Sequence, residues 1–246
     1  MLQETRRTVE NPRLILLLDE ADFLLEIEEE SNSPAPRRGM RKGRHRVDER
    51  VQRVLRAALQ SQKTGSCLRA VVAGSGDLST YMLQHSSPFF NHFRFVHLKP
   101  LSREETRELI VKPAEMLGVT FLPDAIERIS SFSGCQPYYC QALCYEAFAY
   151  AQQLDTKLID NTEVELAEQK ISNDLFHAFR SGIWRRATRK EHAFLAALVR
   201  GEPYLSPSSG NLLRLLDWQI IVKAQERYHF SAGLFEQWTA RALKEG

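Results

Sequence analysis

Two adjacent acidic residues follow a run of apolar residues near the start of the chain. Asp19 and Glu20 come directly after residues 14–18, which are all leucine or isoleucine. A short continuous apolar run ended by acids is typical of a strand buried on both faces of a parallel sheet. Open α/β sheets bind ligands at the edge where such strands end. We therefore expect Asp19 and Glu20 to lie at a ligand-binding edge.

The two carboxylates suit two different tasks in phosphoryl transfer. This reaction needs Mg²⁺ to neutralise the phosphate oxygens and a group that orients the attacking water. Successive side chains leaving a strand point in different directions, so one can face the ion while the other faces the water. We predict Asp19 as the metal ligand and Glu20 as the catalytic residue. In an alternative interpretation, both acids only favour the start of a following helix.

The elements that must position these acids read as an α/β unit. A second apolar run covers residues 68–73, and residues 47–62 between the two runs carry apolar side chains at helical spacing. A third short strand is expected at residues 93–98. The order strand, helix, strand predicts a parallel sheet. Residues 26–46 change from acidic to strongly basic and are expected to form a mobile loop, which we interpret as a solvated insertion. In the alternative interpretation this loop is a basic finger that binds nucleic acid or a partner.

After Pro100 the pattern changes to helices with recognisable start signals. Three pairs have capping-box or similar spacing, namely Ser102 with Glu105, Asp124 with Glu127, and Thr162 with Glu165. We expect Pro113 to kink or restart its helix, because proline removes a backbone donor and clashes with the preceding turn. The pattern predicts a helical subdomain at residues 101–160 and a connecting helix at 161–185.

The last segment begins with another capping pair, Thr188 and Glu191, which predicts a helix. A second helix at about residues 208–218 precedes two strand candidates at 220–224 and 228–231. This order is that of a winged helix, which we expect to span residues 186–246. Its own small core is predicted to consist of Phe194, Leu198, Leu212, Leu216, Trp218, Phe230, Phe235 and Trp238.

The stretch from Arg13 to Asp22 resembles the Walker B motif of P-loop ATPases, specifically the AAA+ and related signal-transducing (STAND) group. In that family the next core strand ends in a small polar sensor residue, and Ser75 stands in the matching place. Arg94 matches a finger residue that reaches a phosphate or a neighbouring protomer, although a surface arginine is the alternative. The resemblance thus implies Glu20, Ser75 and Arg94 as catalytic residues and Asp19 as the metal ligand.

A second resemblance is to the helical lid of archaeal-type and STAND ATPases. In that lid a Gly-Gly-x-Pro turn precedes a helix, and its proline packs near the adenine. The matching turn is Gly134-Cys135-Gln136-Pro137, in which cysteine replaces the second glycine. If that position needs a positive φ, the cysteine is costly there. The resemblance implies Pro137 as a cofactor-binding residue, while simple helix initiation is the alternative.

The family's phosphate-binding loop, Gly-x-x-x-x-Gly-Lys-Ser/Thr, does not occur in these 246 residues. Its backbone amides cradle the phosphates and its lysine offsets their charge. The resemblance therefore implies a partial P-loop NTPase sheet (residues 1–100) that uses ATP and Mg²⁺ in the complete protein and is inactive alone. The loop would come from a protein partner or an N-terminal domain. In the alternative, a degenerate ATPase scaffold carries a winged helix that binds DNA or protein without catalysis.

Asp19-Glu20-Ala21-Asp22 also spells the acid motif of DEAD-box helicases. Those enzymes need a second RecA-like domain after this one. The sequence beyond Pro100 predicts helices and a winged helix instead, which disfavours RNA unwinding.

Composition limits the remaining function classes. The chain is 43% hydrophobic and 26% charged, as in ordinary globular proteins, and its formal net charge of +2 is too small for a strong overall field. No run approaches the roughly 20 apolar residues of a membrane span. The four cysteines lack paired metal-binding spacing, which favours a cytoplasmic protein. A local basic segment, Arg185, Arg186, Arg189 and Lys190, is expected to anchor the winged helix to the lid or nucleotide domain rather than to DNA.

Overall fold

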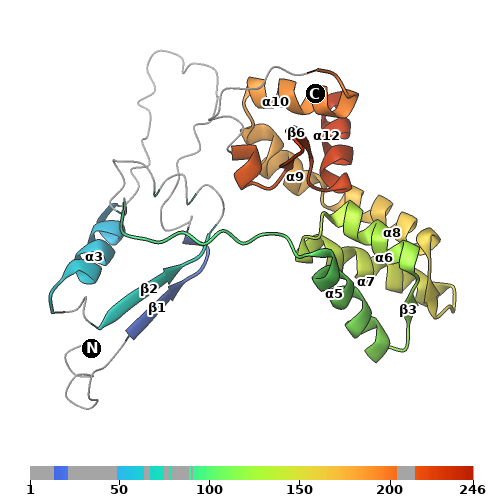
Figure 1. Cartoon of the computed structure of the whole chain (residues 1–246), viewed down its shortest axis with the longest axis horizontal. Coiled ribbons are helices and arrows are strands. Elements are labelled where there is room, and N and C mark those ends of the chain that lie inside the picture. The colour runs from blue at the N-terminus through green and yellow to red at the C-terminus, as the bar shows by residue number, and fades with distance from the viewer. Residues whose placement is uncertain are drawn as a thin grey trace, which may run out of the picture. The chain divides into compact units, whose positions relative to one another are not determined.

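The computed structural model describes residues 14–21, 49–63, 67–74, 78, 82, 89, 91–203 and 214–245. The chain divides into two compact units, Met1–Val96 and His97–Gly246, whose ribbons are drawn in Figure 1. Each unit has its own cluster of buried apolar residues. The expected loop at residues 26–46 lies outside the described residues.

The first unit contains a pair of parallel strands and a helix. β1 (Leu14–Leu18) pairs with β2 (Leu68–Val72), with Leu14 opposite Leu68 and Leu18 opposite Val72. α3 (Glu49–Gln60) lies between them in sequence and contacts β2. The strands and helix predicted from the apolar pattern are therefore confirmed, with ends that differ by one or two residues.

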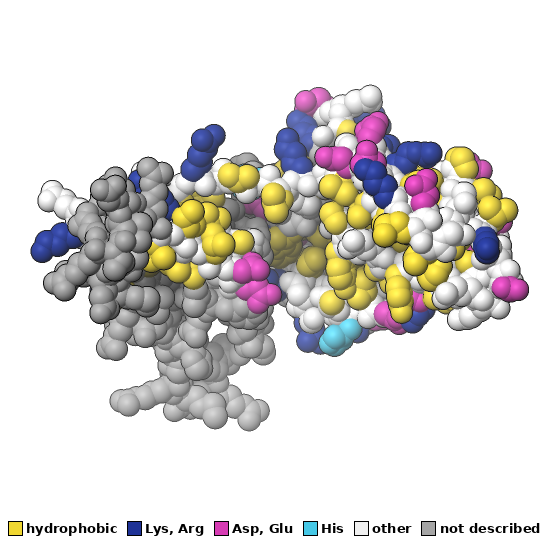
Figure 2. Space-filling view, turned by 90° about the horizontal axis from the view of Figure 1, so that it is seen from below, with side chains coloured by type: hydrophobic (Ala, Val, Ile, Leu, Met, Phe, Trp, Pro, Cys, Tyr) yellow, Lys and Arg dark blue, Asp and Glu magenta, His cyan; other side chains and the backbone are white. Residues whose placement is uncertain are grey.

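The prediction that these strands are buried on both faces is wrong. Leu17 is 71% exposed and Val71 is 58% exposed, and Leu14 and Ile15 are also exposed. Hydrophobic side chains at exposed positions are visible in Figure 2. The physical reason is that β1 and β2 form a sheet of two strands among the described residues, so much of their apolar surface has no covering element.

The third predicted strand, at residues 93–98, is also wrong. Phe93 and Phe95 pack against the first unit's cluster of Ala21, Leu78, Met82 and Phe89, while Arg94 and Val96 are exposed. The segment thus keeps the alternation of a strand. It is not assigned to a sheet, because within the described residues no strand pairs with it.

The second unit is mainly helical. Its helices are α5 (Arg103–Met116), α6 (Pro123–Ser133), α7 (Pro137–Gln153), α8 (Asn161–Asp174), α9 (Phe176–Gly182), the short 3-10 helix η1 (Trp184–Arg186), α10 (Arg189–Arg200) and α12 (Gly233–Glu245). β3 (Thr120–Phe121) and β4 (Leu158–Ile159) form a short parallel pair. β5 (Ile221–Ala224) and β6 (Arg227–Phe230) form an antiparallel hairpin, and residues 214–217 are helical.

Two helix starts agree with the sequence pattern. Ser102 caps α5 in a reciprocal box with Glu105, and these hydrogen bonds lower the pKa of the Glu105 carboxyl. Thr188 and Glu191 form the same box at α10. Both pairs stand at the helix ends that local chemistry alone predicts.

Two other helix starts were predicted wrongly. α6 begins at Pro123 after Leu122, without a side-chain cap, and the box of α8 is Asp160 with Glu163. The reason is the unpredicted β3–β4 pair, which holds the chain up to Leu122 through its N–H bond to Ile159 O, 2.9 Å. Each helix therefore starts directly after its strand, slightly earlier than the predicted cap.

The structure bears on two predictions about helix continuity. α5 does not restart at Pro113 but runs through it to Met116, because the proline lies in the last turn, where little helix remains to be disturbed, and the kink stays a prediction. The expected single connecting helix at 161–185 is instead α8, α9 and η1, with a break at Leu175.

One apolar core extends through the whole second unit. Tyr139 on α7 contacts the rings of Phe235 and Trp238 on α12, with centroid distances of 5.6 and 5.9 Å. Phe179 on α9 lies 5.3 Å from Trp238, whose indole N–H donates to Ser172 O on α8. The predicted separate core for residues 186–246 is therefore wrong, since α12 completes a core shared with α7, α8 and α9.

Tyr139 makes the stability of this core dependent on alkaline pH. Burial raises the pKa of Tyr139 to about 12, above its ordinary value near 10. Both states keep the proton below pH 10, whereas between about pH 10 and 12 only the unfolded state loses it. We expect the free energy of unfolding to fall by up to about 2 kcal/mol across that window because of this residue.

Urea unfolding of the wild type and of Tyr139→Phe at pH 9 and pH 11.5 measures this effect. The phenylalanine variant keeps the ring and should lose less stability between the two values. An equal loss in both proteins would show that Tyr139 does not contribute.

Candidate functional site

Asp19 and Glu20 lie at the carboxyl edge of the β1–β2 pair. Ala73 N donates to Leu18 O at 2.8 Å, and Ala21 N donates back to Ala73 O at 2.9 Å. The two acids occupy the turn between these bonds, and both are exposed. This is the position expected for residues that follow a parallel strand, at the edge where open α/β sheets bind ligands.

The backbone of this turn is strained at the predicted catalytic residue. Glu20 has a φ of 49°, in the left-handed region that residues other than glycine rarely adopt. Asp19 Oδ1 accepts a hydrogen bond from Glu20 N at 2.9 Å and so supports the turn. Strained backbone of this kind gathers at functional sites, which supports a specific role for this pair.

Asp19 is suited to supply the carboxylate that the protein contributes to a magnesium site. Its second carboxylate oxygen has no hydrogen-bond partner among the described residues. In phosphoryl-transfer sites Mg²⁺ is held by one or two carboxylates together with phosphate oxygens. The described residues contain no group of three His, Cys, Asp or Glu that could hold a metal without such a ligand. The acids therefore fit the ion, whereas the motif Gly-x-x-x-x-Gly-Lys-Ser/Thr does not occur in these 246 residues.

The structure locates only some of the other predicted site residues. Ser75 lies outside the described residues, just beyond the end of β2. Arg94 is exposed on the extended segment of the first unit. Pro137 belongs to the second unit, where it is exposed at the first position of α7. Among these residues, Asp19 and Glu20 are brought together.

The turn before α7 has an uncommon backbone. Gly134 and Cys135 both have positive φ, 60° and 58°. The position of Cys135 is thus one that favours glycine, as the comparison with a Gly-Gly-x-Pro turn suggested. Cys135 N donates to Ser130 O at 3.1 Å, which closes the end of α6.

Gly134 touches a distant part of the second unit. A Cβ atom added at Gly134 would lie 2.3 Å from Ser231 O and 2.8 Å from Ala232 Cβ. Ser231 and Ala232 join β6 to α12. The turn at residues 134–137, which the family resemblance predicts as the lid turn, is therefore in close contact with the C-terminal segment, residues 186–246. Sequence reasoning missed this contact because no local signal links these residues.

Arg214 forms an ion pair inside the second unit. Its guanidinium donates to both carboxylate oxygens of Glu191 and to Arg186 O, and it stacks 4.7 Å from the centroid of Trp218. The Glu191 side chain is only 1% exposed. Arg214 belongs to the helix predicted at residues 208–218, which would be the candidate recognition helix if the winged helix bound DNA. Its guanidinium is therefore already engaged within the protein.

The four residues of the basic segment differ in their contacts. Arg186 lies over the Trp218 ring at 5.4 Å. Arg185, Arg189 and Lys190 are exposed and form no hydrogen bond or ion pair among the described residues. These three side chains thus have no partner within the described part of the chain, and the anchoring of the segment to the lid or nucleotide domain stays a prediction.

Comparison with known proteins supports a fold assignment. No family model and no curated protein matches the sequence. The Walker-type ATPase PABY2304 of Pyrococcus abyssi is structurally similar, with a TM-score of 0.60, 14% sequence identity, and coverage of 93% of this chain and 63% of that chain. This chain has a P-loop ATPase fold. The Thermotoga maritima RuvB Holliday junction branch migration motor aligns with a TM-score of 0.45 and 15% identity over 88% of this chain and 75% of that chain.

The P-loop ATPase fold confirms the mixed α/β class predicted from the apolar runs, with small parallel sheets and many helices. The chain spans less than two thirds of the archaeal ATPase's length. No helix among the described residues is long and apolar enough to cross a membrane.

Proposed function

We propose that this chain carries the acidic residues, the lid and the C-terminal module of an ATP-dependent switch of the AAA+/STAND type, working in the cytoplasm. The observation that carries the proposal is the strained Asp19-Glu20 turn at the carboxyl edge of a parallel strand pair. It occurs on a P-loop ATPase fold, in which such an edge receives the nucleotide.

The side chains divide the chemistry between them. Bound ATP would supply the phosphoryl group, and Mg²⁺ would neutralise the charge of that group. Asp19 would offer one carboxylate oxygen to the ion, and Glu20 would orient a water molecule. Ser75 acts as the polar sensor after β2, Arg94 reaches a phosphate or a neighbouring protomer, and Pro137 lies against the adenine.

A protein partner or an N-terminal domain supplies the missing phosphate-binding loop. The exposed apolar side chains of β1 and β2 support this part of the proposal, as does Val96, which is 79% exposed. Large exposed apolar patches on soluble proteins mark sites of protein–protein interaction or ligand binding. Added strands would cover these side chains and place the loop beside the acids.

The C-terminal segment, residues 186–246, acts as a winged helix that follows the lid. Its order of α10, helical residues 214–217, the β5–β6 hairpin and α12 supports this assignment. Because it shares one core with the lid, the two move together and pass on the state of the nucleotide.

The competing function is a non-enzymatic DNA-binding or protein-interaction module on a degenerate scaffold. The exposed cations Arg185, Arg189 and Lys190 favour it, because they have no ionic partner among the described residues. The ion pair of Arg214 with Glu191 argues against base readout by the candidate recognition helix. We therefore rank this function second.

The catalytic proposal predicts that ATP turnover requires the missing loop. The 246-residue chain with Mg²⁺ and ATP should hydrolyse no faster than its Glu20→Gln variant. In a chain extended by a phosphate-binding loop, Glu20→Gln should bind ATP but hydrolyse it about 10²- to 10⁴-fold more slowly, as expected for loss of a general base. Phosphate release and equilibrium nucleotide binding measure the two effects.

Glu104→Gln is the matched control, because Glu104 is an exposed glutamate on α5 outside the proposed site. It should leave turnover unchanged. Hydrolysis by the 246-residue chain that disappears in Glu20→Gln would contradict the need for the loop. Unchanged turnover in the extended Glu20→Gln protein would remove Glu20 from the mechanism.

A further inference from the structure

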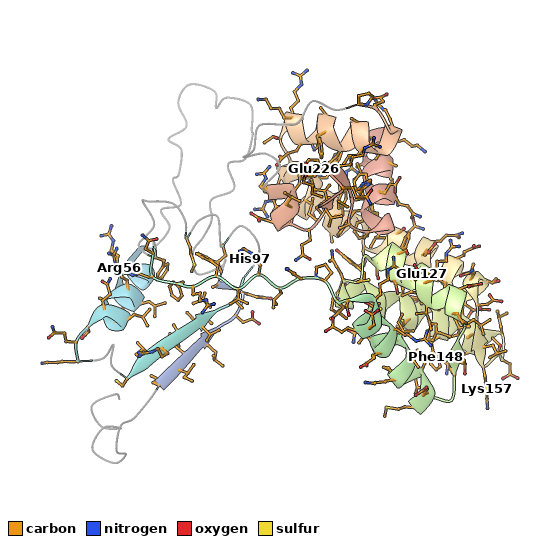
Figure 3. All side chains as sticks on the ribbon, viewed as in Figure 1. Arg56, His97, Glu127, Phe148, Lys157 and Glu226 are labelled. Carbon is orange, nitrogen blue, oxygen red and sulfur yellow. The ribbon has the colours of Figure 1, made fainter. Side chains whose placement is uncertain are left out.

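The chain enters the second unit through a segment held by two backbone contacts. Leu98 O accepts a hydrogen bond from the side-chain amide of Gln219, at 2.7 Å, and Leu101 N donates to Cys135 O at 3.0 Å. Leu98 is 82% exposed, so apolar packing does not hold it. His97, labelled in Figure 3, lies on the same extended segment. Residues 98–101 are called the entry segment below.

Gln219 and the turn that contains Cys135, which both bond the entry segment, are linked to each other through Ser231. The Ser231 hydroxyl donates to Gln219 O and contacts Ile220 O at 3.2 Å. The Ser231 carbonyl lies against Gly134, next to Cys135. The entry segment, the lid turn and the C-terminal segment therefore meet in one connected set of contacts.

The backbone is strained on both sides of this set. Cys135 has a φ of 58° and Gln219 a φ of 55°. Glycine or asparagine suits a left-handed position better than glutamine does. Asparagine, however, is one methylene shorter and would not span the distance that Gln219 spans to Leu98 O. The contact with the entry segment thus explains why a residue poorly suited to this backbone stands there.

We propose that Gln219 is a positioning residue that clamps the entry segment to the C-terminal segment. Moving residues 98–101 requires breaking the Gln219 bond or displacing the lid turn together with Ser231. The position of the entry segment is thereby coupled to the contact between lid and C-terminal segment. The clamp itself needs no nucleotide, and its use in transmitting the nucleotide state rests on the proposed function.

Hydrogen exchange on the full 246-residue chain without nucleotide tests the clamp. Two variants remove the bond: Gln219→Asn shortens the side chain, and Gln219→Glu keeps its length but removes the donor. In both, the Leu101 amide should exchange on the order of 10-fold faster, since its segment opens locally. Gln219→Asn should leave the thermal midpoint unchanged or raised, because asparagine relieves backbone strain.

Gln225→Asn is the matched control. Gln225 also has a positive φ, 47°, but lies in the turn between β5 and β6, and among the described residues no hydrogen bond or ion pair joins it to the entry segment. It should leave Leu101 exchange at the wild-type rate. The clamp is overturned if both Gln219 variants behave like this control, or if Leu101 exchange rises only together with every amide of the second unit. Neither outcome depends on ATP, so failure of the clamp is distinguishable from failure of the proposed ATPase.

Discussion

Replacing Gly134 with alanine is expected to destabilise the second unit by roughly 2–5 kcal/mol. A left-handed backbone costs alanine about 1–2 kcal/mol, and overpacking a close contact adds about 1–3 kcal/mol. The overpacking arises because the new Cβ would meet the backbone oxygen of Ser231 at 2.3 Å, and a backbone atom has little freedom to move. Urea unfolding followed by tryptophan fluorescence reports on this unit, which contains all three tryptophans.

Two neighbouring experiments separate backbone strain from the close contact. Gly201 has a φ of 64° but no atom within 4 Å of an added Cβ, so Gly201→Ala should cost only the backbone term of about 1–2 kcal/mol. Cys135→Gly should be neutral or stabilise by up to about 1 kcal/mol, since it relieves the strain at φ 58°. Equal effects of Gly134→Ala and Gly201→Ala would show that the contact with Ser231 is not tight in solution.

Replacing Arg214 with alanine is expected to cost about 3–5 kcal/mol, because it leaves the charge of Glu191 buried and unpaired. The same carboxylate also caps α10 through Thr188 N, so it cannot turn away to solvent without losing the cap. Urea unfolding of Arg214→Ala, Glu191→Gln and the double variant gives the coupling energy of the pair. Two residues in one hydrogen-bonded pair should couple by about 0.5–3 kcal/mol.

Lys112→Ala is the matched control for this pair. Lys112 pairs with Glu108 on the same helix, and both side chains are more than 60% exposed. Exposed pairs of this kind contribute about 0.3–0.5 kcal/mol. A loss for Arg214→Ala as small as that for Lys112→Ala would show that the buried charge is solvated in some other way.

The parts of the fold that sequence predicted well are set by neighbours along the chain. Apolar runs located β1 and β2, and helical spacing located α3. The capping box at Ser102 needs only residues within one helical turn. The position of Asp19 and Glu20 also follows from local order, since residues that end a parallel strand must reach its carboxyl edge.

The failed predictions concern contacts between residues far apart in sequence. Strand burial depends on which strands lie alongside, and the described residues pair β1 only with β2. The β3–β4 pair moved the starts of α6 and α8, and its strands are too short to show a period. The contact of Gly134 with Ser231 likewise has no local signature beyond a glycine that a turn would also explain.

The core shared by α7, α8, α9 and α12 restricts how this chain can be divided or recombined. A cut before residue 186 would uncover the faces of Tyr139 and Phe179 that α12 now covers, and would leave the indole of Trp238 without Ser172 O. Neither piece would retain a complete interior. Residues 97–246 therefore form the smallest portion suitable for transplantation into a chimaera, and a C-terminal module exchanged alone would have to bring a matching helical surface with it.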